Sequence, residues 1–358
     1  MTAEVLPGPA PVRREPGRLR TFLTTIRAVL TRELRWRMRG RRAFLIATVT
    51  VLLLGLLVFG IYQALYEGAV NDARWRFDDG FGGGQVVVTQ AISGAVSARI
   101  GQAILGGLLG VLTVITLLIA PALTSGVVSS EREKQTLELL VTTPVSTLGM
   151  LIGKLLGALA YVFLLIIASV PLMAIVFVFG GVDPGDVVRA YLAVLAIAIG
   201  TGAIGLFFSA LIGRTQVATV VSYLVVFGLV VGTGALYAWL YATSVQDDGR
   251  GNLIEVRRHA PEALLWLNPL VTDIDIMCTA VPDVGGFCDY IVLVRGLPEN
   301  APVPPRDAFW PRSALAFLVL AGVLTILSTQ LISPSRRWRP RGRGRAPAAP
   351  VAPADATA

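Results

Sequence analysis

The sequence is poor in charged residues, histidine and cysteine, and each shortage argues against a class of function. Asp, Glu, Lys and Arg make up 15% of the 358 residues, against about 25% in average soluble domains. A Cys/His zinc site takes three or four closely spaced ligands, and the chain holds only His259, Cys278 and Cys288. No Cys-x-x-Cys, His-Glu-x-x-His or haem-attachment motif occurs. These shortages argue against a soluble globular enzyme and against a Cys/His metal centre.

Apolar residues are abundant instead, and they come in long blocks. They make up 54% of the chain, and the mean hydropathy is +0.69, which argues against a disordered chain. Runs of about 20 apolar residues are long enough to cross a bilayer as helices. Six such runs are present, at 43–66, 104–128, 155–180, 187–212, 216–241 and 312–333. We therefore expect an all-α integral membrane protein with one six-span domain over 43–333.

Lysine and arginine are unevenly distributed between the two sides of this arrangement. With the N-terminus inside, the inside segments hold 21 of the 31 Lys and Arg residues and 7 of the 23 acidic residues. These segments are 1–42, 129–154, 213–215 and 334–358. Because Lys and Arg mark the cytoplasmic side, we expect a multi-pass protein of the plasma (cell inner) membrane with both termini cytoplasmic. The Arg-rich start predicts an uncleaved first span rather than a signal peptide.

The segments that flank the spans differ in character. Residues 1–17 are Pro-rich and predict a disordered tail, and 334–358 form a basic, Pro-rich tail suited to anionic lipid headgroups. Nucleic-acid binding would need more than this charge, so we expect none. Residues 18–42 place apolar side chains at helical spacing between arginines, which predicts an amphipathic interfacial helix. That helix is either a membrane-surface anchor or part of the contact with a cytoplasmic partner.

The long outside segment 242–311 is acidic and contains both cysteines. Its apolar stretch 263–271 is too short to span, and we expect a short helix at the outer membrane edge, before Asp273 and Asp275. If this loop faces an oxidising compartment, Cys278 and Cys288 would pair. Their separation of ten residues permits a disulfide without requiring one.

Two glycine motifs resemble nucleotide-binding signatures but lack the required context. Gly200, Gly202 and Gly205 match the dinucleotide fingerprint, yet they lie inside an apolar span with no strand before it. They favour close helix packing instead, and the pairs Gly106–Gly110 and Gly228–Gly232 mark further candidate helix or subunit contacts. The segment 149–155 is one residue shorter than a P-loop and ends in leucine where Ser or Thr would bind magnesium. We therefore expect neither a nucleotide site nor enzymatic activity in this chain.

The span centres offer few polar side chains. They contain Thr, Ser, Tyr and Gln but no ionisable pair, which disfavours an ion-coupled carrier. Four polar residues of the spans are placed either to line a pathway or to form hydrogen bonds between helices, and the second role is the more common one in membrane helices. They are Tyr161, Ser209, Ser222 and Tyr223.

The inside segment 129–154 carries the most distinctive pattern. Alternating charges precede an amphipathic run that a Thr-Pro pair ends, and the residues are Glu131, Arg132, Glu133, Lys134, Thr136, Leu137, Glu138, Leu139, Leu140, Thr143 and Pro144. Ser146 is then placed to cap the next helix, which enters the membrane near Lys154. The pattern predicts a short helix over 131–140, outside the bilayer and exposed for docking by a soluble protein.

This stretch resembles the ABC-2 type transporter permeases, the membrane subunits of ATP-binding-cassette (ABC) exporters. That family typically shows Glu-basic-Glu, then Gly-Thr-Leu-Glu, two Leu, Thr-Pro, and Gly-Lys opening the next span. The corresponding residues are Glu131 to Glu133, Thr136 to Glu138, Leu139 and Leu140, Thr143 and Pro144, and Gly153 and Lys154. Gln135 stands where the family usually has Gly. The basic N-terminal helix with Glu33 and Leu34, the six spans and the Asn268-Pro269 pair also fit.

The resemblance implies a mechanism in which 131–140 is a coupling helix seated in a groove of a cytoplasmic ABC ATPase subunit. Its three glutamates would bond basic groups there, and ATP and magnesium would bind that ATPase and not this chain. Two permease copies, as a homodimer or heterodimer, would form the exporter in the lipid bilayer. Three alternatives stay open: glutamates that pair only within the chain, a non-transporting scaffold or assembly protein of the same fold, and an ion-coupled carrier. The substrate is not specified by the sequence.

Overall fold

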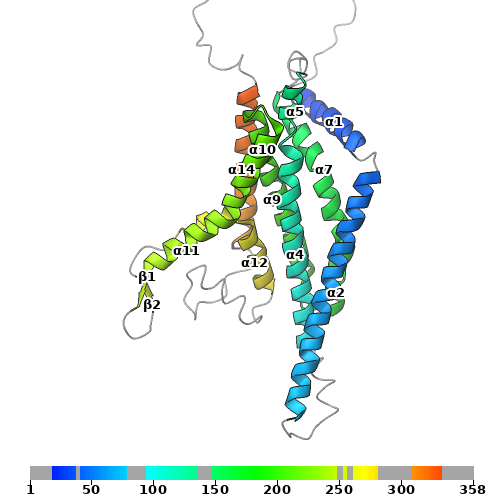
Figure 1. Ribbon diagram of the computed structural model, residues 1–358, viewed down its shortest axis with the longest axis vertical. Helices are drawn as coiled ribbons and strands as arrows, with labels where there is room; N and C mark the ends of the chain where they lie inside the picture. The colour runs from blue at the N-terminus through cyan, green and yellow to red at the C-terminus, as the bar shows by residue number, and fades with distance from the viewer. Residues whose placement is uncertain are drawn as a thin grey trace, which may run out of the picture.

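The part of the chain that the structure describes folds almost entirely into helices (Figure 1). The computed structural model describes residues 18–37, 41–78, 94–135, 147–247, 253–255, 261–280 and 308–332. Within these residues the only strands are β1 (Val245–Asp247) and β2 (Leu253–Glu255), which form a small antiparallel hairpin. The helices are α1 (Arg18–Arg37), α2 (Arg41–Asp78), α4 (Gly94–Thr124), α5 (Ser129–Glu133), α7 (Thr147–Ala174), α8 (Val176–Phe179), α9 (Pro184–Leu211), α10 (Thr215–Phe227), η1 (Gly228–Gly232), α11 (Thr233–Ser244), η2 (Glu262–Leu267), α12 (Pro269–Ala280) and α14 (Trp310–Ile332).

Six helical segments are long and apolar enough to cross a membrane. They run over Ala47–Glu67, Ser97–Glu133, Thr147–Phe179, Pro184–Leu211, Thr215–Leu240 and Trp310–Ile332. Each overlaps one predicted span, so the six-span, all-α membrane fold is confirmed. The second segment extends several residues past its apolar run at both ends, because a helix continues beyond the hydrocarbon core wherever its polar residues can be solvated.

The helix α9 lies in the middle of the bundle, and its glycines let neighbouring helices approach closely. A Cβ atom added at Gly205 would lie 2.1 Å from the hydroxyl oxygen of Thr124 on α4. At Gly200 and Gly202 the nearest atoms belong to Phe317 on α14 and Leu159 on α7. The prediction that these three glycines serve helix packing is confirmed. The pair Gly228 and Gly232 has no atom of the described chain within 4 Å of such a Cβ, so a subunit contact there stays a prediction.

Helix α9 begins with a complete capping arrangement. The carboxylate of Asp183 accepts a hydrogen bond from the backbone N–H of Gly185 (3.1 Å), and Asp186 accepts one from the N–H of Asp183 (3.3 Å). Pro184 occupies the first helical position, where a missing N–H costs nothing. Asp186 also forms an ion pair with Arg189. These bonds fix where the fourth span starts.

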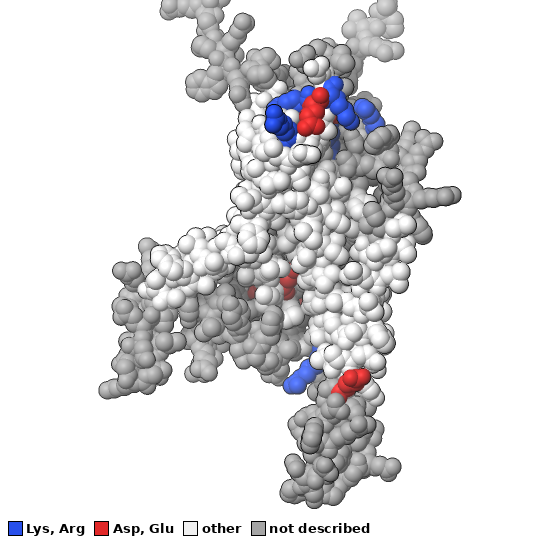
Figure 2. Space-filling view, in the orientation of Figure 1, with Lys and Arg blue, Asp and Glu red and all other residues white. Residues whose placement is uncertain are grey.

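The two ends of the bundle differ in composition. Helix α1, helix α5 and the C-terminal end of α14 lie at the same end (Figure 1), as an even number of crossings requires. Figure 2 shows Lys and Arg side chains gathered over that end. We call it the elbow end, defined by α5, the start of α7, the end of α9 and the start of α10.

The fifth span is bent at a wide helical turn. The π-helical segment η1 joins α10 to α11, and α11 slants away from the bundle (Figure 1). Below the bend, Asn268 donates hydrogen bonds to the carbonyl oxygen of Val230 (2.9 Å) and to the hydroxyl of Thr233 (3.0 Å). Tyr237 on α11 packs with Leu265 and Phe309. Segment η2 and helix α12 are thereby held against span five.

The expectation of one short helix over 263–271 differs from the structure. The chain forms the 3-10 helix η2, breaks at Asn268, and begins α12 at Pro269. Asn268 caps α12 by accepting from the N–H groups of Leu270 (3.1 Å) and Val271 (3.2 Å). Because α12 then packs against α4, α9 and α14, Asp273 and Asp275 become buried, 6% and 2% exposed. Hydropathy alone could not show this, since it counts both acids against burial.

Candidate coupling site

A serine on α9 anchors the start of α5. Helix α4 passes through a turn at 125–128 before α5 begins, and the first N–H groups of α5 have no side-chain cap from their own segment. The fully buried hydroxyl oxygen of Ser209 accepts from the N–H of Val128 (2.9 Å) and of Ser129 (3.0 Å). A helix start leaves such donors unpaired, so span four satisfies the donors of α5.

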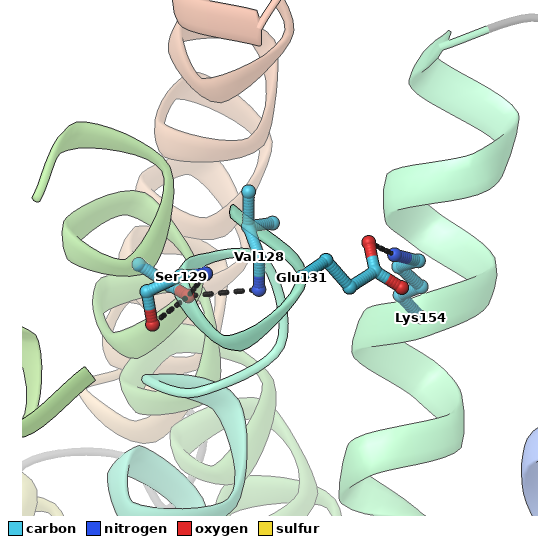
Figure 3. A network of polar contacts seen from close by, with 5 residues as sticks. Val128, Ser129, Glu131 and Lys154 are labelled. Atoms are coloured by element: carbon cyan, nitrogen blue, oxygen red, sulfur yellow. Dashed lines mark hydrogen bonds and ion pairs between the residues drawn. The ribbon is translucent and has the colours of Figure 1, made fainter. Parts of the chain in front are cut away.

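The next turn of α5 is joined to span three by an ion pair. Glu131 reaches across to Lys154 on α7 and bonds its ammonium group (Figure 3). The Lys154 side chain is 6% exposed and that of Glu131 27% exposed. A buried ammonium group is stable only with a counter-charge. The Gly-Lys pair that opens span three therefore has a structural partner, and it is the first glutamate of the charged run.

The other side of α5 bonds to the turn between spans four and five. The carboxylate of Glu133 accepts hydrogen bonds from the N–H (2.8 Å) and the hydroxyl (3.1 Å) of Thr215, at the start of α10. A carboxylate at a helix N-terminus is favoured by the unpaired N–H groups and the helix dipole there. Arg132 donates to the carbonyl oxygen of Ala210 on α9 (3.1 Å).

Hydroxyl pairs continue the same contact toward the membrane interior. The hydroxyl oxygens of Ser129 and Thr215 lie 3.0 Å apart, and those of Ser125 and Thr219 lie 2.7 Å apart. Spans two and five are thus joined by side chains on two successive turns.

A backbone reversal ends α5 immediately after its charges. Gln135 has φ = +56°, in the left-handed region that glycine adopts without strain. This is the position where the ABC-2 permeases usually have Gly. The predicted continuous helix over 131–140 therefore differs from the structure, whose helix ends at Glu133. The remaining predicted coupling residues, Thr136, Leu137, Glu138, Leu139, Leu140, Thr143 and Pro144, lie outside the described residues.

The N-terminal helix α1 packs against the start of α7 beside this site. A Cβ atom added at Gly153 would lie 2.9 Å from Cβ of Val29 and 3.4 Å from the carbonyl oxygen of Ile26. Glycine at 153 thus permits the close approach of α1. Lys154 is the next residue, so α1 lies directly behind the ion pair.

An open pocket lies on the exposed side of the site. It has a volume of about 670 Å³ and is lined by Ser130, Glu133, Arg214, Thr215, Gln216 and Val217. The lining carries an acid and a base, and Lys134 beside it is exposed. Glu131 is not among the residues that line the pocket.

Sequence reasoning found the charged run but not its partners. Glu131 and Glu133 were expected either to bond a partner protein or to pair only within the chain. The structure joins them to Lys154 and Thr215, and a contact with a partner stays a prediction. The turn 213–215 had been placed on the same side, which was the available signal for Thr215. Ser209 was expected among the residues that bond between helices, but its bond to α5 was not.

The polar residues of the spans mostly bond to neighbouring backbone. Ser209 bonds α5, and Tyr223 donates to the carbonyl oxygen of Leu118 on α4, as expected for bonding between helices. Ser222 bonds within its own helix.

The predicted cysteine pair is described only at its first member. Cys278 is buried on α12 and is not a free thiol. Cys288 lies outside the described residues, so the bond between the two stays a prediction.

The bundle defines a class of protein. Six membrane-length helices, with polar contacts that join α5 to spans three, four and five, form a multi-pass helical membrane protein. The chain belongs to the ABC-2 family of transporter proteins, whose family profile matches residues 27–330. A comparison with curated proteins finds no match.

Proposed function

We propose that this chain is the permease subunit of an ATP-binding-cassette exporter. A separate cytoplasmic ATPase would bind ATP and magnesium and hydrolyse the ATP. It would dock on the segment that begins at Glu131 and continues through Thr136, Leu137, Glu138, Leu139, Leu140, Thr143 and Pro144. Two permease subunits, identical or related, would enclose the pathway in the plasma membrane.

One observation carries the proposal: a single five-residue helix is bonded to three other spans. Side chains of α5 or its first N–H groups bond Lys154 on span three, Ser209 and Ala210 on span four, and Thr215 on span five. A force applied to the chain just after α5 would reach all of these spans together. A bundle with two arrangements can be biased in this way by a partner's ligand.

The bonds of two glutamates narrow the proposed docking segment to the residues after Glu133. Glu131 and Glu133 are bonded to other residues of the chain, so they stabilise the position of α5 against its neighbouring spans. Lys134 and Gln135 are exposed, and the pocket beside Glu133 is open. The docking contacts would therefore come from Lys134 onward.

Co-purification tests the docking claim without knowledge of the substrate. Tagged permease carrying Glu138→Arg, or the pair Leu139→Asp and Leu140→Asp, is expected to lose most of the co-purified ATPase and its permease-dependent ATP hydrolysis. The control is Glu262→Arg, a reversal of charge at the opposite end of the bundle. Equal recovery of the ATPase with the elbow variants and the control would refute the proposal.

The side of the membrane that the elbow faces is tested separately. In a background with both cysteines replaced by serine, Lys134→Cys is expected to react with a membrane-impermeant maleimide in inside-out vesicles and not in sealed right-side-out vesicles. Reaction from the outside would contradict docking by a cytoplasmic ATPase.

A further inference from the structure

A buried carboxyl group lies far from the elbow, on a helix that is not one of the six spans. Asp273 is on α12, which is too short to cross a membrane but packs into the bundle against α4, α9 and α14. Its neighbour on α4 is Thr113. Figure 2 shows acidic atoms recessed in the middle of the molecule, at the height where Figure 1 places α12.

The depth of this group follows from helix geometry. The second membrane-length segment runs over Ser97–Glu133, and Thr113 lies about 24 Å along the helix from Ser97, at about 1.5 Å per residue. The hydrocarbon core of a bilayer is about 30 Å thick. Asp273 therefore lies beside the middle of span two, within the bundle.

The carboxyl group has no partner that would stabilise its charge. Both oxygens of Asp273 are buried and make no hydrogen bond, and the buried hydroxyl of Thr113 makes none either. An ionised carboxylate in such surroundings costs several kcal/mol, and proteins avoid that cost by keeping the group neutral. Burial raises the pKa of Asp273 well above its ordinary value, and the nearby Thr113 hydroxyl lowers the pKa by a smaller amount.

The charged and titratable groups on the surrounding elements have other partners or are exposed. On α9, Arg189 pairs with Asp186, and Tyr191 lies 3.1 Å from the hydroxyl of Ser169. On α14, Arg312 lies 3.9 Å from Glu262 of η2. The described part of α4 carries the exposed Arg99, and α12 itself carries Asp275, which has a contact of its own. None of the described ion pairs includes Asp273.

The contacts of α12 show what ionisation would affect. Its N-terminal end is fastened to the fifth and sixth spans by Asn268 and by the bond of 2.6 Å between Thr272 and Ser313. The face that meets α4 is different: it presents Asp273 to Thr113 and packs Met277 against Gly106. That face has apolar packing and no described hydrogen bond to oppose the hydration of a charged carboxylate.

We propose that Asp273 is a proton-binding site, and that α12 lies against α4 only while the proton is bound. Loss of the proton leaves an unpaired charge at a buried contact, so the Asp273 face of α12 separates from Thr113. The inference requires no ATPase and stands apart from the proposed function.

The direction of the pH effect follows from the raised pKa. A carboxyl group whose pKa is higher in the folded than in the unfolded chain stabilises the fold fully below its unfolded pKa of about 4. That contribution is lost as the pH rises through the higher folded pKa. The packing of α12 should therefore loosen with rising pH, and Asp273→Asn, neutral at every pH, should remove this dependence.

Carbodiimide labelling tests the site on the unsubstituted full chain in lipid vesicles. Dicyclohexylcarbodiimide adds to protonated carboxyl groups in apolar surroundings: the acid proton moves to a carbodiimide nitrogen, and the carboxyl oxygen bonds the central carbon. Mass spectrometry should find Asp273 modified at low pH, with modification falling as the pH rises, while the exposed Glu262 stays unmodified. Modification of Asp273 at no pH, or equally at every pH, would overturn the proposal.

Hydrogen exchange tests the movement of α12. After correction for the intrinsic pH dependence of exchange, the amides of α12 should lose protection with rising pH in the unsubstituted chain and in the control Glu262→Gln. In Asp273→Asn they should keep their protection. Equal loss in Asp273→Asn would overturn the link between the proton and the helix, and the labelling result stands even if that variant does not fold.

Discussion

Replacing Glu131 by glutamine removes the carboxylate that is paired with Lys154 and leaves the ammonium group buried at the elbow end. Removing one partner of a fully buried ion pair costs about 3–5 kcal/mol. Glu131 is 27% exposed, and water screens that part of the interaction. We therefore expect Glu131→Gln to lower the free energy of unfolding by about 2–3 kcal/mol.

The double variant Glu131→Gln with Lys154→Met removes both charges. It therefore distinguishes the free energy of the Glu131–Lys154 ion pair from the cost of leaving the Lys154 ammonium group buried and unpaired. Replacing both charges by uncharged groups of similar size is often close to neutral, so the double variant should be more stable than Glu131→Gln alone. The matched control is Glu262→Gln, whose partner Arg312 is 54% exposed at 3.9 Å; its cost should be below about 1 kcal/mol.

The assay is unfolding of detergent-solubilised protein for all four chains under identical conditions. A cost for Glu131→Gln no larger than that of the Glu262→Gln control would refute the reasoning. So would a double variant that is no more stable than Glu131→Gln alone.

Three further outcomes are expected from the same unfolding assay. Asn268→Ala should cost about 2–4 kcal/mol, because it removes two bonds donated to span five and two accepted from the first N–H groups of α12; a cost below that of the Glu262→Gln control would contradict this. Gln135→Gly should stabilise the elbow by up to about 1 kcal/mol, since it relieves a left-handed backbone; a loss of stability would show that the side chain matters more than the backbone. Gly205→Ala should cost about 1–3 kcal/mol through its clash with Thr124, whereas Gly110→Ala, with nothing within 4 Å, should be tolerated; equal effects would contradict the packing argument.

The spans were predictable because membrane insertion imposes a simple requirement on composition. About 20 apolar residues in a row must be helical in lipid, whatever they pack against. Their ends were less predictable: the second span was expected over 104–128, and the helical segment runs over Ser97–Glu133. Hydropathy locates the hydrocarbon core, while local capping and bonding decide where a helix stops.

The partners within the site depended on packing, which no local pattern encodes. The charged run at 131–134 stood out in the sequence, but the contact with Lys154 arises only when spans two and three lie side by side. Gln135 was noticed as a departure from glycine, and its positive φ gives that departure a physical meaning. Asp273 was placed in an outer loop because acids count against membrane burial, and only the packing of α12 on α4 shows otherwise.

The wide turn in the fifth span determines the shape of the region beneath it. A π-helical turn accommodates one residue more than the regular repeat, and here Asn268 bonds the carbonyl oxygen of Val230 within it. Deleting one residue from Gly228–Gly232 would restore the regular helical repeat and remove the bend in span five. Helix α11 would lose its slant, and Tyr237 would lose its packing against Leu265 and Phe309. A change in length of one residue at this point would thus remove contacts that hold α12 in place. This effect would arise far from the charged residues of the elbow end.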